Sequence, residues 1–188
     1  SDRAYQNVSF RLAPQPSFLA GAPGVDPHPA GGQGRSDLRV PLLGNANGRA
    51  NVTLWAMDDG GTARGGNDTS ANRTFLLVVL PVNNPPSFAS LPVVRVPEGP
   101  APSTGPREDP FATAMLAGPP DEEASQSVTF NAPVQVGGNY ALFDAPPVVD
   151  AASGNVTYTL RAYENGYANF TVALRDDGGT ERGGVDVS

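Results

Sequence analysis

Apolar and polar residues alternate along several short stretches of the chain. In the segment 51–57, Val52, Leu54 and Ala56 occupy one set of alternate positions. Successive side chains of a β-strand point to opposite faces, so this pattern predicts a strand with one buried face. The same pattern predicts further strands over 74–80, 93–96, 127–131 and 155–160, and inward positions for Phe170, Val172 and Leu174.

The segments between these strands are rich in turn-forming residues. The 188 residues include 22 Gly and 20 Pro, and no segment repeats apolar residues with a period of 3.6. Gly and Pro supply the backbone angles of turns and interrupt helices. Many short strands in units of about 100 residues are typical of antiparallel Greek-key sandwiches. The sequence therefore predicts an all-β fold.

Three segments recur in the same order in the two halves of the chain. The matched pairs are 6–10 with 126–130, 51–54 with 169–172, and 58–68 with 176–186. The first pair is 120 residues apart (126 − 6) and the third is 118 residues apart (176 − 58), so a small insertion or deletion separates them. Conserved order and spacing across three segments indicate two homologous units.

The phase of this repeat predicts that both units are incomplete. Residues 1–84 form repeat 1, which lacks its N-terminal strands, and residues 85–188 form repeat 2. The strand at 74–80 follows the third matched segment of repeat 1, and its counterpart in repeat 2 would lie beyond Ser188. Repeat 2 therefore lacks its C-terminal strand. Open edges would result, so we expect either neighbouring sequence or a partner chain to supply the missing strands.

The second unit and the junction before it resemble a known family. Segments 119–122, 126–130, 154–158 and 176–186 are similar to the cadherin-like or Ig-like repeats of large surface adhesins, whose hairpin carries the pattern Asp-x-Gly-Gly-Thr…Gly-Gly-x-Asp. The junction 81–88 resembles the Val-Asn-Asp-Ala-Pro-x-Phe junction of that family. The resemblance covers nearly the whole chain. It implies two tandem Ig-like/cadherin-like Greek-key β-sandwiches, neighbouring repeats of the same parent chain as partners, and no catalysis.

Composition limits the function classes. The net charge of −7 argues against nucleic acid, because phosphates would repel this surface. The chain has no Cys, so its core forms without disulfides and thiolate chemistry is excluded. No apolar run approaches 18 residues, so no membrane span is expected. The chain opens on Ser1-Asp2-Arg3 without a signal peptide, and we interpret it as an internal piece of a longer protein.

Six Asn-x-Ser/Thr sequons occur where chance would give about one or two. They predict N-glycosylation and passage through a eukaryotic secretory pathway, hence an extracellular or cell-surface location. The alternative is that Asn-Val-Thr simply suits the start of a strand. All twelve basic residues are Arg, which together with the Pro-rich loops suggests an algal surface protein such as a mastigoneme (flagellar hair) protein. The sequons lie at Asn7, Asn51, Asn67, Asn72, Asn155 and Asn169.

The Asp/Gly hairpins offer oxygen ligands, and calcium is the only cofactor they suggest. Carboxylates and carbonyls on a flexible Gly loop suit a Ca²⁺ cage. The alternative is a solvated hairpin in which Gly supplies positive φ and Asp caps the turn. The junction argues against calcium, because Asn84 is a neutral ligand where the family presents a carboxylate. The candidate ligands are Asp176, Asp177, Asp186, Glu98 and Asp121, with Glu122 as a neighbour.

An apolar face is predicted on the outer side of repeat 1. Strand alternation places Trp55 and Met57 outward on one strand, and Leu76, Val78 and Leu80 outward on the next. Antiparallel neighbours would join them into one patch, and a contiguous exposed patch with a Trp is typical of an interface. The alternative is that a loop or glycan of the same chain covers it. The expected partners are further copies of this protein or other surface glycoproteins.

No catalytic constellation can be assembled from the sequence. His28 lies between two prolines, and a lone His without Cys cannot build a zinc site. The paired glycines at 60–61 and 65–66 lack the Gly-Lys-Ser/Thr context of a phosphate loop. We therefore expect a non-catalytic structural segment of a secreted, glycosylated cell-surface, extracellular-matrix or filament protein. The alternative is a calcium-dependent adhesion or carbohydrate-binding module.

Overall fold

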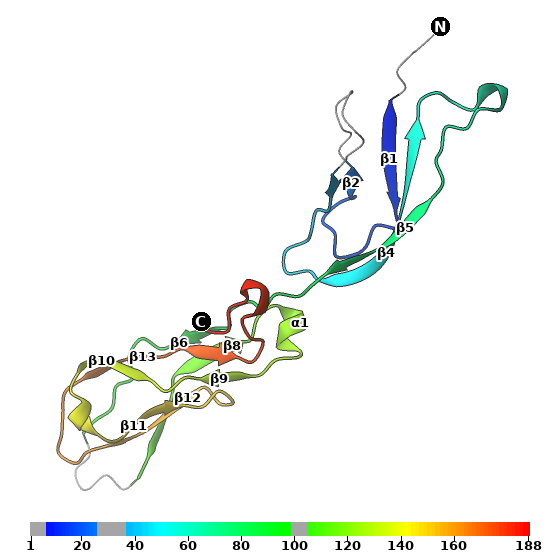
Figure 1. Cartoon of the computed structure of the whole chain (residues 1–188). Helices are drawn as coiled ribbons and strands as arrows, with labels where there is room; N and C mark the ends of the chain where they lie inside the picture. Colours follow the sequence, from blue (N-terminus) through cyan, green and yellow to red (C-terminus); the bar gives the residue numbers. More distant parts are fainter. Residues whose placement is uncertain (1–6, 26–36, 99–104) are drawn as a thin grey trace. The chain divides into compact units, whose positions relative to one another are not determined.

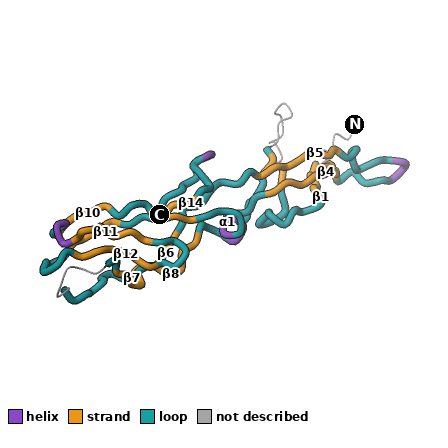
Figure 2. The backbone as a smooth tube through the Cα atoms, turned by 90° about the horizontal axis from the view of Figure 1, so that it is seen from below, coloured by secondary structure: helices purple, strands orange, loops and turns teal. Residues whose placement is uncertain are grey.

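The chain divides into two compact units in the computed structural model (Figure 1). They comprise Ser1–Pro81 and Val82–Ser188, so the boundary lies three residues before the expected one. The structure describes residues 7–25, 37–98 and 105–188, and His28 falls outside them. Short antiparallel strands joined by loops make up most of the described part (Figure 2). The all-β prediction is confirmed.

Unit 1 is built on a three-stranded antiparallel sheet in the order β1-β4-β5. The long β4 pairs with β1 through residues 53–58 and with β5 through residues 48–54. A two-stranded ribbon, β2-β3, accompanies it. The elements of this unit are β1 (Val8–Ala13), β2 (Gly24–Val25), β3 (Leu38–Arg39), β4 (Gly48–Asp58), the 3₁₀ turn η1 (Ala63–Gly65) and β5 (Arg73–Val79).

The core of unit 1 lies on one face of this sheet. Val52 in the middle of β4 is fully buried, and Phe75 lies directly opposite it on β5. A segment with little regular structure precedes β4 and contains Phe18 and Leu19, which are both buried, and the ring of Phe18 lies against Gly48 of β4. Leu43 donates its backbone N–H to the carbonyl of Phe18 and so ties the two halves of this segment together.

The described residues of unit 2 form four small antiparallel sheets. Their strand orders are β11-β12-β7, β10-β13, β14-β9 and β6-β8. The elements are β6 (Ser87–Ser90), β7 (Arg107–Pro110), β8 (Ala112–Leu116), α1 (Pro120–Glu123), β9 (Val128–Phe130), β10 (Val134–Gly138), η2 (Tyr140–Leu142), β11 (Phe143–Val149), β12 (Asn155–Leu160), β13 (Ala168–Thr171), β14 (Leu174–Asp176) and η3 (Glu181–Gly183).

The core of unit 2 gathers around β12 and its neighbours. Val156 and Tyr158 of β12 pack with Val149 of β11 and Ala112 of β8. Aromatic and aliphatic side chains from other strands surround this cluster, and several meet edge to face, such as Phe88 with Phe130 at a centroid distance of 5.1 Å. Burial of these apolar side chains from distant segments is the main source of stability for the unit.

The turn between β11 and β12 docks onto β8 through Gly154. The carbonyl of Gly154 accepts the backbone N–H of Ala112 at 2.7 Å. Both the N–H and the hydroxyl of Ser153 donate to Oδ2 of Asp150 at the start of the turn. These hydrogen bonds from Ser153 lower the pKa of the Asp150 carboxyl below its ordinary value.

The sequence pattern located most of the strands it was applied to. The predicted segments 51–57, 74–80, 127–131 and 155–160 coincide with β4, β5, β9 and β12, respectively. In unit 2, Leu174 is fully buried as expected.

The prediction of a strand at 93–96 is wrong. Val94 and Val96 do pack against the core, but among the described residues this segment forms no strand. Pro92 and Pro97 flank it, and proline lacks the N–H that a strand ladder requires. The strand that precedes β7 is instead β6.

None of the helices in the described ranges is long and apolar enough to cross a membrane.

Candidate functional site: two matched loops and a linker clasp

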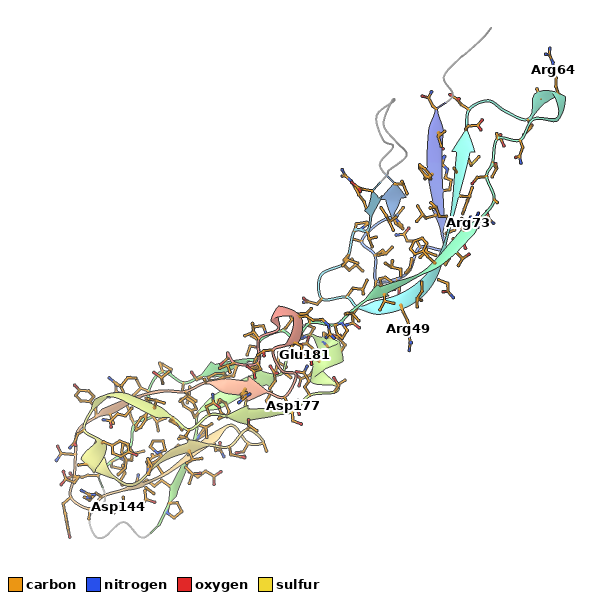
Figure 3. The ribbon with its side chains drawn as sticks, in the orientation of Figure 1. Arg49, Arg64, Arg73, Asp144, Asp177 and Glu181 are labelled. Carbon is orange, nitrogen blue, oxygen red and sulfur yellow. The ribbon has the colours of Figure 1, made fainter. Side chains whose placement is uncertain are left out.

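A loop closed by hydrogen bonds follows β4 in unit 1. Asp58 donates its backbone N–H to the carbonyl of Asp68 at 2.9 Å, which closes the base of the loop. Its Oδ1 accepts the N–H of Gly60 at 2.8 Å, which shapes the first turn. Arg64, at the loop tip (Figure 3), adopts a left-handed conformation with φ 53° and ψ 30°. Asp58 therefore fixes both ends of this loop.

The loop after β14 in unit 2 has the same hydrogen bonds, 118 residues later. Asp176 donates its N–H to the carbonyl of Asp186 at 3.1 Å, and its Oδ1 accepts the N–H of Gly178 at 2.8 Å. Arg182 repeats the left-handed conformation of Arg64, with φ 57° and ψ 24°. Glu181 and Asp177, labelled in Figure 3, belong to this loop. A non-glycine residue in the left-handed conformation is uncommon, so its recurrence at the matched position supports the equivalence of the two loops.

The bonds that attach each loop to its neighbours also match. Ser70 Oγ accepts the N–H of Ala56 at 2.8 Å, and Ser188 Oγ accepts that of Leu174 at 3.0 Å. On the adjacent strand, the N–H of Asn7 donates to Oδ1 of Asp59 at 2.9 Å. In unit 2 the N–H of Ser127 donates to Oδ1 of Asp177, also at 2.9 Å. The two loops therefore share their backbone path and their anchoring.

The loop of unit 2 is in addition clasped by Asn83, near the start of that unit. The side-chain amide of Asn83 donates to Oδ1 of Asp176 and to the carbonyl of Val185, both at 2.8 Å. Its Oδ1 accepts the side-chain amide of Gln126 at 2.8 Å. The backbone carbonyl of Asn83 accepts the N–H of Val185 at 3.2 Å. One residue thus joins β14, the far side of the loop and the approach to β9.

Glycine at position 178 makes room for this clasp. A Cβ atom built on Gly178 would collide with the side chains of Asn83 and Gln126. A Cβ on Gly184 would lie only 3.0 Å from that of Asn83. The Gly-Gly pairs of this hairpin therefore have a packing role in unit 2 in addition to their conformational one.

The next residue, Asn84, binds the helix α1. Its side-chain amide donates to Oε1 of Glu122 at 2.9 Å, and its backbone N–H donates to Oε2 at 3.2 Å. Glu123 in the same helix accepts the N–H of Ala117 through Oε2 at 2.7 Å. Both acidic side chains are therefore used to fix backbone segments, and hydrogen bonds to a carboxylate are stronger than those between neutral groups.

Two acceptor atoms in the clasp are buried without a hydrogen-bond partner in the part of the chain that the structure describes. They are Oδ2 of Asp176 and Oε1 of Gln126. Asp176 is only 4% exposed. Sequence reasoning missed Asn83 and Gln126 as functional residues, although the recurrence of Gln6 as Gln126 was a signal that this position matters.

The structure does not bring the candidate calcium ligands into one cluster. Asp176 and Asp177 each accept the hydrogen bonds given above, and Asp186 forms an ion pair with Arg175 at 2.8 Å. Glu98 lies on an exposed segment, and Asp121 is exposed in α1. Within residues 7–25, 37–98 and 105–188, no three His, Cys, Asp or Glu side chains group so as to hold a metal ion.

The sequons differ in exposure. Four lie on the surface with exposed side chains: Asn51, Asn67, Asn72 and Asn169. Asn7 is exposed and donates to Oδ2 of Asp59 at 2.9 Å. Asn155 is half-buried, and its amide donates to Oε1 of Glu108 at 2.7 Å.

The strand register divides the predicted apolar face of unit 1 into two parts. Leu76 and Val78 are 58% and 49% exposed on β5, and Leu80 after it is also exposed. Trp55 and Met57 are half-buried on β4 opposite β1, beyond the end of the β4-β5 ladder. Between the two parts lies a polar pair, whose hydroxyl oxygens are 3.0 Å apart: Thr53 and Thr74. The expectation of a single continuous patch is therefore corrected.

No known protein family, curated protein or solved structure matches this chain.

Proposed function

We propose that the chain consists of two copies of one Ig-like β-sandwich module in series and is a structural segment of a secreted, glycosylated protein of a cell surface, matrix or filament. The observation that carries the proposal is the residue-for-residue match of the two loops. Asp58, Ser70 and Arg64 make the same bonds or adopt the same backbone conformation as Asp176, Ser188 and Arg182. Two modules with the same internal bonding suit a repeated scaffold.

The role of the module in this proposal is mechanical. In unit 2, Asn83 and Asn84 tie the first residues of the unit to its own loop and to α1. A force that enters along the chain therefore meets a set of charge-assisted hydrogen bonds before it reaches the core strands. Pro85 and Pro86 follow directly and stiffen the backbone at this point.

The secreted location in the proposal is supported by the sequons. Five of the six sequon asparagines are exposed, which leaves room for glycans on the folded surface. The absence of Cys from the sequence is compatible with this location because the core of unit 2 is packed without disulfides.

Secretion of the chain from a eukaryotic cell tests the proposal. We expect the intact mass to fall by several glycans after enzymatic deglycosylation of the denatured protein. A chain in which all six asparagines are changed to Gln is the control and should show no change. A wild-type mass that stays the same after treatment would contradict the secreted, glycosylated part of the proposal.

A calcium-dependent adhesion or carbohydrate-binding module is the second candidate. The two buried acceptors in the clasp, Oδ2 of Asp176 and Oε1 of Gln126, favour it because oxygen acceptors without donors suit a cation. Thermal unfolding with Ca²⁺ and with EGTA separates the two candidates. The structural role predicts the same melting temperature in both, whereas a calcium-dependent rise that Asp176→Asn abolishes would favour the adhesion module.

A further inference from the structure

The outer face of β13 presents an aromatic ring, a sequon asparagine and its threonine in a row. Tyr167, Asn169 and Thr171 are exposed, whereas the two residues between them are half-buried. Successive side chains of a strand point to opposite faces, so the three exposed residues share one face. The carbonyl of Tyr167 accepts the N–H of Asn139 at 2.8 Å, so the pairing of this segment extends to the aromatic residue. Tyr167 and Thr171 therefore flank Asn169 along the strand.

The neighbouring strand leaves room beside Asn169. β10 runs antiparallel to β13, and its residue opposite Asn169 is Gly137 (Figure 1). A Cβ atom built on Gly137 would lie 3.5 Å from Nδ2 of Asn169, the atom to which a glycan attaches. A larger side chain at this position would occupy the space next to that nitrogen. Glycine opposite the sequon therefore keeps the attachment atom accessible.

The surface around this sequon is apolar. Tyr167 is 70% exposed, and Val134 and Val136 of β10 are 63% and 65% exposed. Val134 lies directly opposite Thr171, so it belongs to the same face of the ribbon. A group of exposed apolar side chains is typical of a surface that binds another group. A glycan on Asn169 starts in the middle of this surface.

The matched sequon of unit 1 lacks the aromatic residue. Asn51 lies 118 positions before Asn169 (169 − 51), and the residue at the place of Tyr167 is Arg49. Another Tyr stands two positions before the first sequon of the chain, but it falls outside the described residues. The remaining three sequons have a small residue at this position: Gly65, Ser70 and Ser153. Among the described residues, an aromatic ring therefore precedes only the sequon at Asn169.

An aromatic ring at this distance is within reach of the first sugar of a glycan. The face of an aromatic ring carries partial negative charge, and the C–H groups on one side of a sugar ring are apolar and slightly positive. Residues two apart on one face of a strand are separated by about 7 Å. A sugar attached to Nδ2 of Asn169 therefore spans the distance to the ring of Tyr167.

We propose that the N-glycan of Asn169 folds back onto β13, with its first sugar stacked on the ring of Tyr167, and so stabilises unit 2. The ligand of this surface is the first N-acetylglucosamine of the chain's own glycan. In the attachment, Nδ2 of Asn169 forms a bond to C1 of the sugar and loses a proton. The bond from C1 to the diphosphate of a lipid-linked oligosaccharide breaks. The inference rests on the proposed function, which supplies the secretory glycosylation.

A double-mutant cycle on the full chain, secreted from a eukaryotic cell, tests the inference. Its four members are the wild type, Tyr167→Ser, Asn169→Gln and the double variant. We expect Asn169→Gln to lower the melting temperature of unit 2 by at least about 3 °C in the wild type, and by less than about 1 °C when Tyr167 is already replaced. Equal losses in the two backgrounds, or no loss in either, would overturn the inference.

Two controls separate sugar stacking from direct contact between the side chains. The same four chains made in a bacterial cytoplasm carry no N-glycan, and there we expect no coupling between positions 167 and 169. In the secreted chain, Asn51→Gln removes the matched glycan of unit 1 and should change the melting temperature of that unit by less than about 1 °C, because Arg49 offers no ring. Coupling that persists without sugar, or an equal loss at Asn51, would count against the inference.

Proton NMR of the secreted chain gives a readout that does not depend on stability. Protons held over the face of an aromatic ring shift upfield, so we expect upfield-shifted sugar C–H signals that Tyr167→Ser removes. Sugar signals at the positions of a free glycan would contradict the stacking. A chain that carries glycans at other sequons but none at Asn169 would lose this inference alone, whereas a chain without any N-glycan contradicts the proposed function as well.

Discussion

The side-chain amide of Asn83 donates a hydrogen bond of 2.8 Å to Oδ1 of Asp176, 93 residues further along the chain. The same carboxylate oxygen shapes the loop by accepting the N–H of Gly178. The start of unit 2 and its loop are therefore held by one acceptor atom, at a residue that is 96% buried. This bond explains why the polar junction residue is itself part of the folded unit.

Truncation of Asn83 is expected to destabilise unit 2. Asn83→Ala removes the acceptor of the Gln126 amide and one of the two donors to Oδ1 of Asp176, which keeps the N–H of Gly178. An unsatisfied buried polar group costs about 1–3 kcal/mol. Chemical denaturation of the chain measures the change in the free energy of unfolding. Asn165→Ala, at an exposed loop position, is the control and should stay within about 0.5 kcal/mol of the wild type. Equal effects of the two substitutions would show that the clasp contributes nothing.

The glycine of the β11-β12 turn is expected to tolerate no side chain. Gly154 and Gly179 both have positive φ, 74° and 78°, so alanine carries a similar backbone penalty of about 1–2 kcal/mol at each. A Cβ on Gly154 would also collide with the backbone carbonyl of Ala112, whereas one on Gly179 meets no atom within 4 Å. Gly154→Ala should therefore cost at least about 3 kcal/mol. Thermal melts of both variants provide the comparison, and similar losses would contradict the docking of this turn on β8.

The stability of unit 2 is expected to fall at alkaline pH because of Tyr158. Burial, and then the hydrogen bond that its hydroxyl donates to Asp109, raise the pKa of Tyr158 above its ordinary value of 10.0. Above pH 10 the unfolded chain releases this proton while the folded chain keeps it. The free energy of unfolding therefore decreases as the pH rises from 10 toward the folded-state pKa.

The slope of the unfolding free energy against pH reports the number of protons released on unfolding. Tyr158→Phe should reduce that number by up to one. Melting temperatures of the wild type and of this variant between pH 8 and pH 11 measure the slope, and the difference between the two separates Tyr158 from the other four tyrosines of the sequence. The ultraviolet absorbance of tyrosinate in the wild type minus that in the variant checks the assignment to Tyr158. An identical slope in the variant would exclude Tyr158 as the group responsible.

The glycan at Asn155 is expected to be the hardest to remove from the folded protein. Asn155 is half-buried within β12 and bonded to Glu108, whereas Asn51 and Asn169 are exposed. A deglycosidase needs access to the linkage, so native protein should lose sugar at the exposed positions first. Site mapping by mass spectrometry over a time course measures this order. Release at Asn155 as early as at Asn51 would refute the difference in access, and denatured protein should show no difference between sites.

Sequence patterns predicted those parts of the fold that depend on local alternation. β4, β5 and β12 are buried on one face and therefore have an apolar residue at every second position, which the sequence pattern detects. β11 escaped prediction because Pro146 and Pro147 interrupt its pattern, and the ladder there shifts register between Ala145 and Val148. Prolines are therefore the reason that β11 was not predicted. At 93–96, flanking prolines are the reason that the predicted strand does not form.

The contacts of the candidate site depend on pairing between distant segments. The loop at 176–186 was recognisable because its Asp and Gly residues recur at 58–68. The bond of Asn83 to Asp176 could not be recognised in this way, because the sequence contains no matching residue 118 positions before Asn83. Likewise, the division of the apolar face by Thr53 and Thr74 follows from a register that no single strand specifies.

Stretching single molecules by their two ends tests the central claim, two modules in series, most directly. The chain has no Cys, so one Cys added at each end attaches the handles uniquely. With about 3.6 Å per extended residue, units of 81 and 107 residues (188 − 81) give contour lengths of about 29 and 38 nm. We predict two separate unfolding events of about these lengths, with Val52→Ala weakening only the shorter and Leu174→Ala only the longer. A single event that releases the whole chain, or variants that weaken both events, would contradict the account.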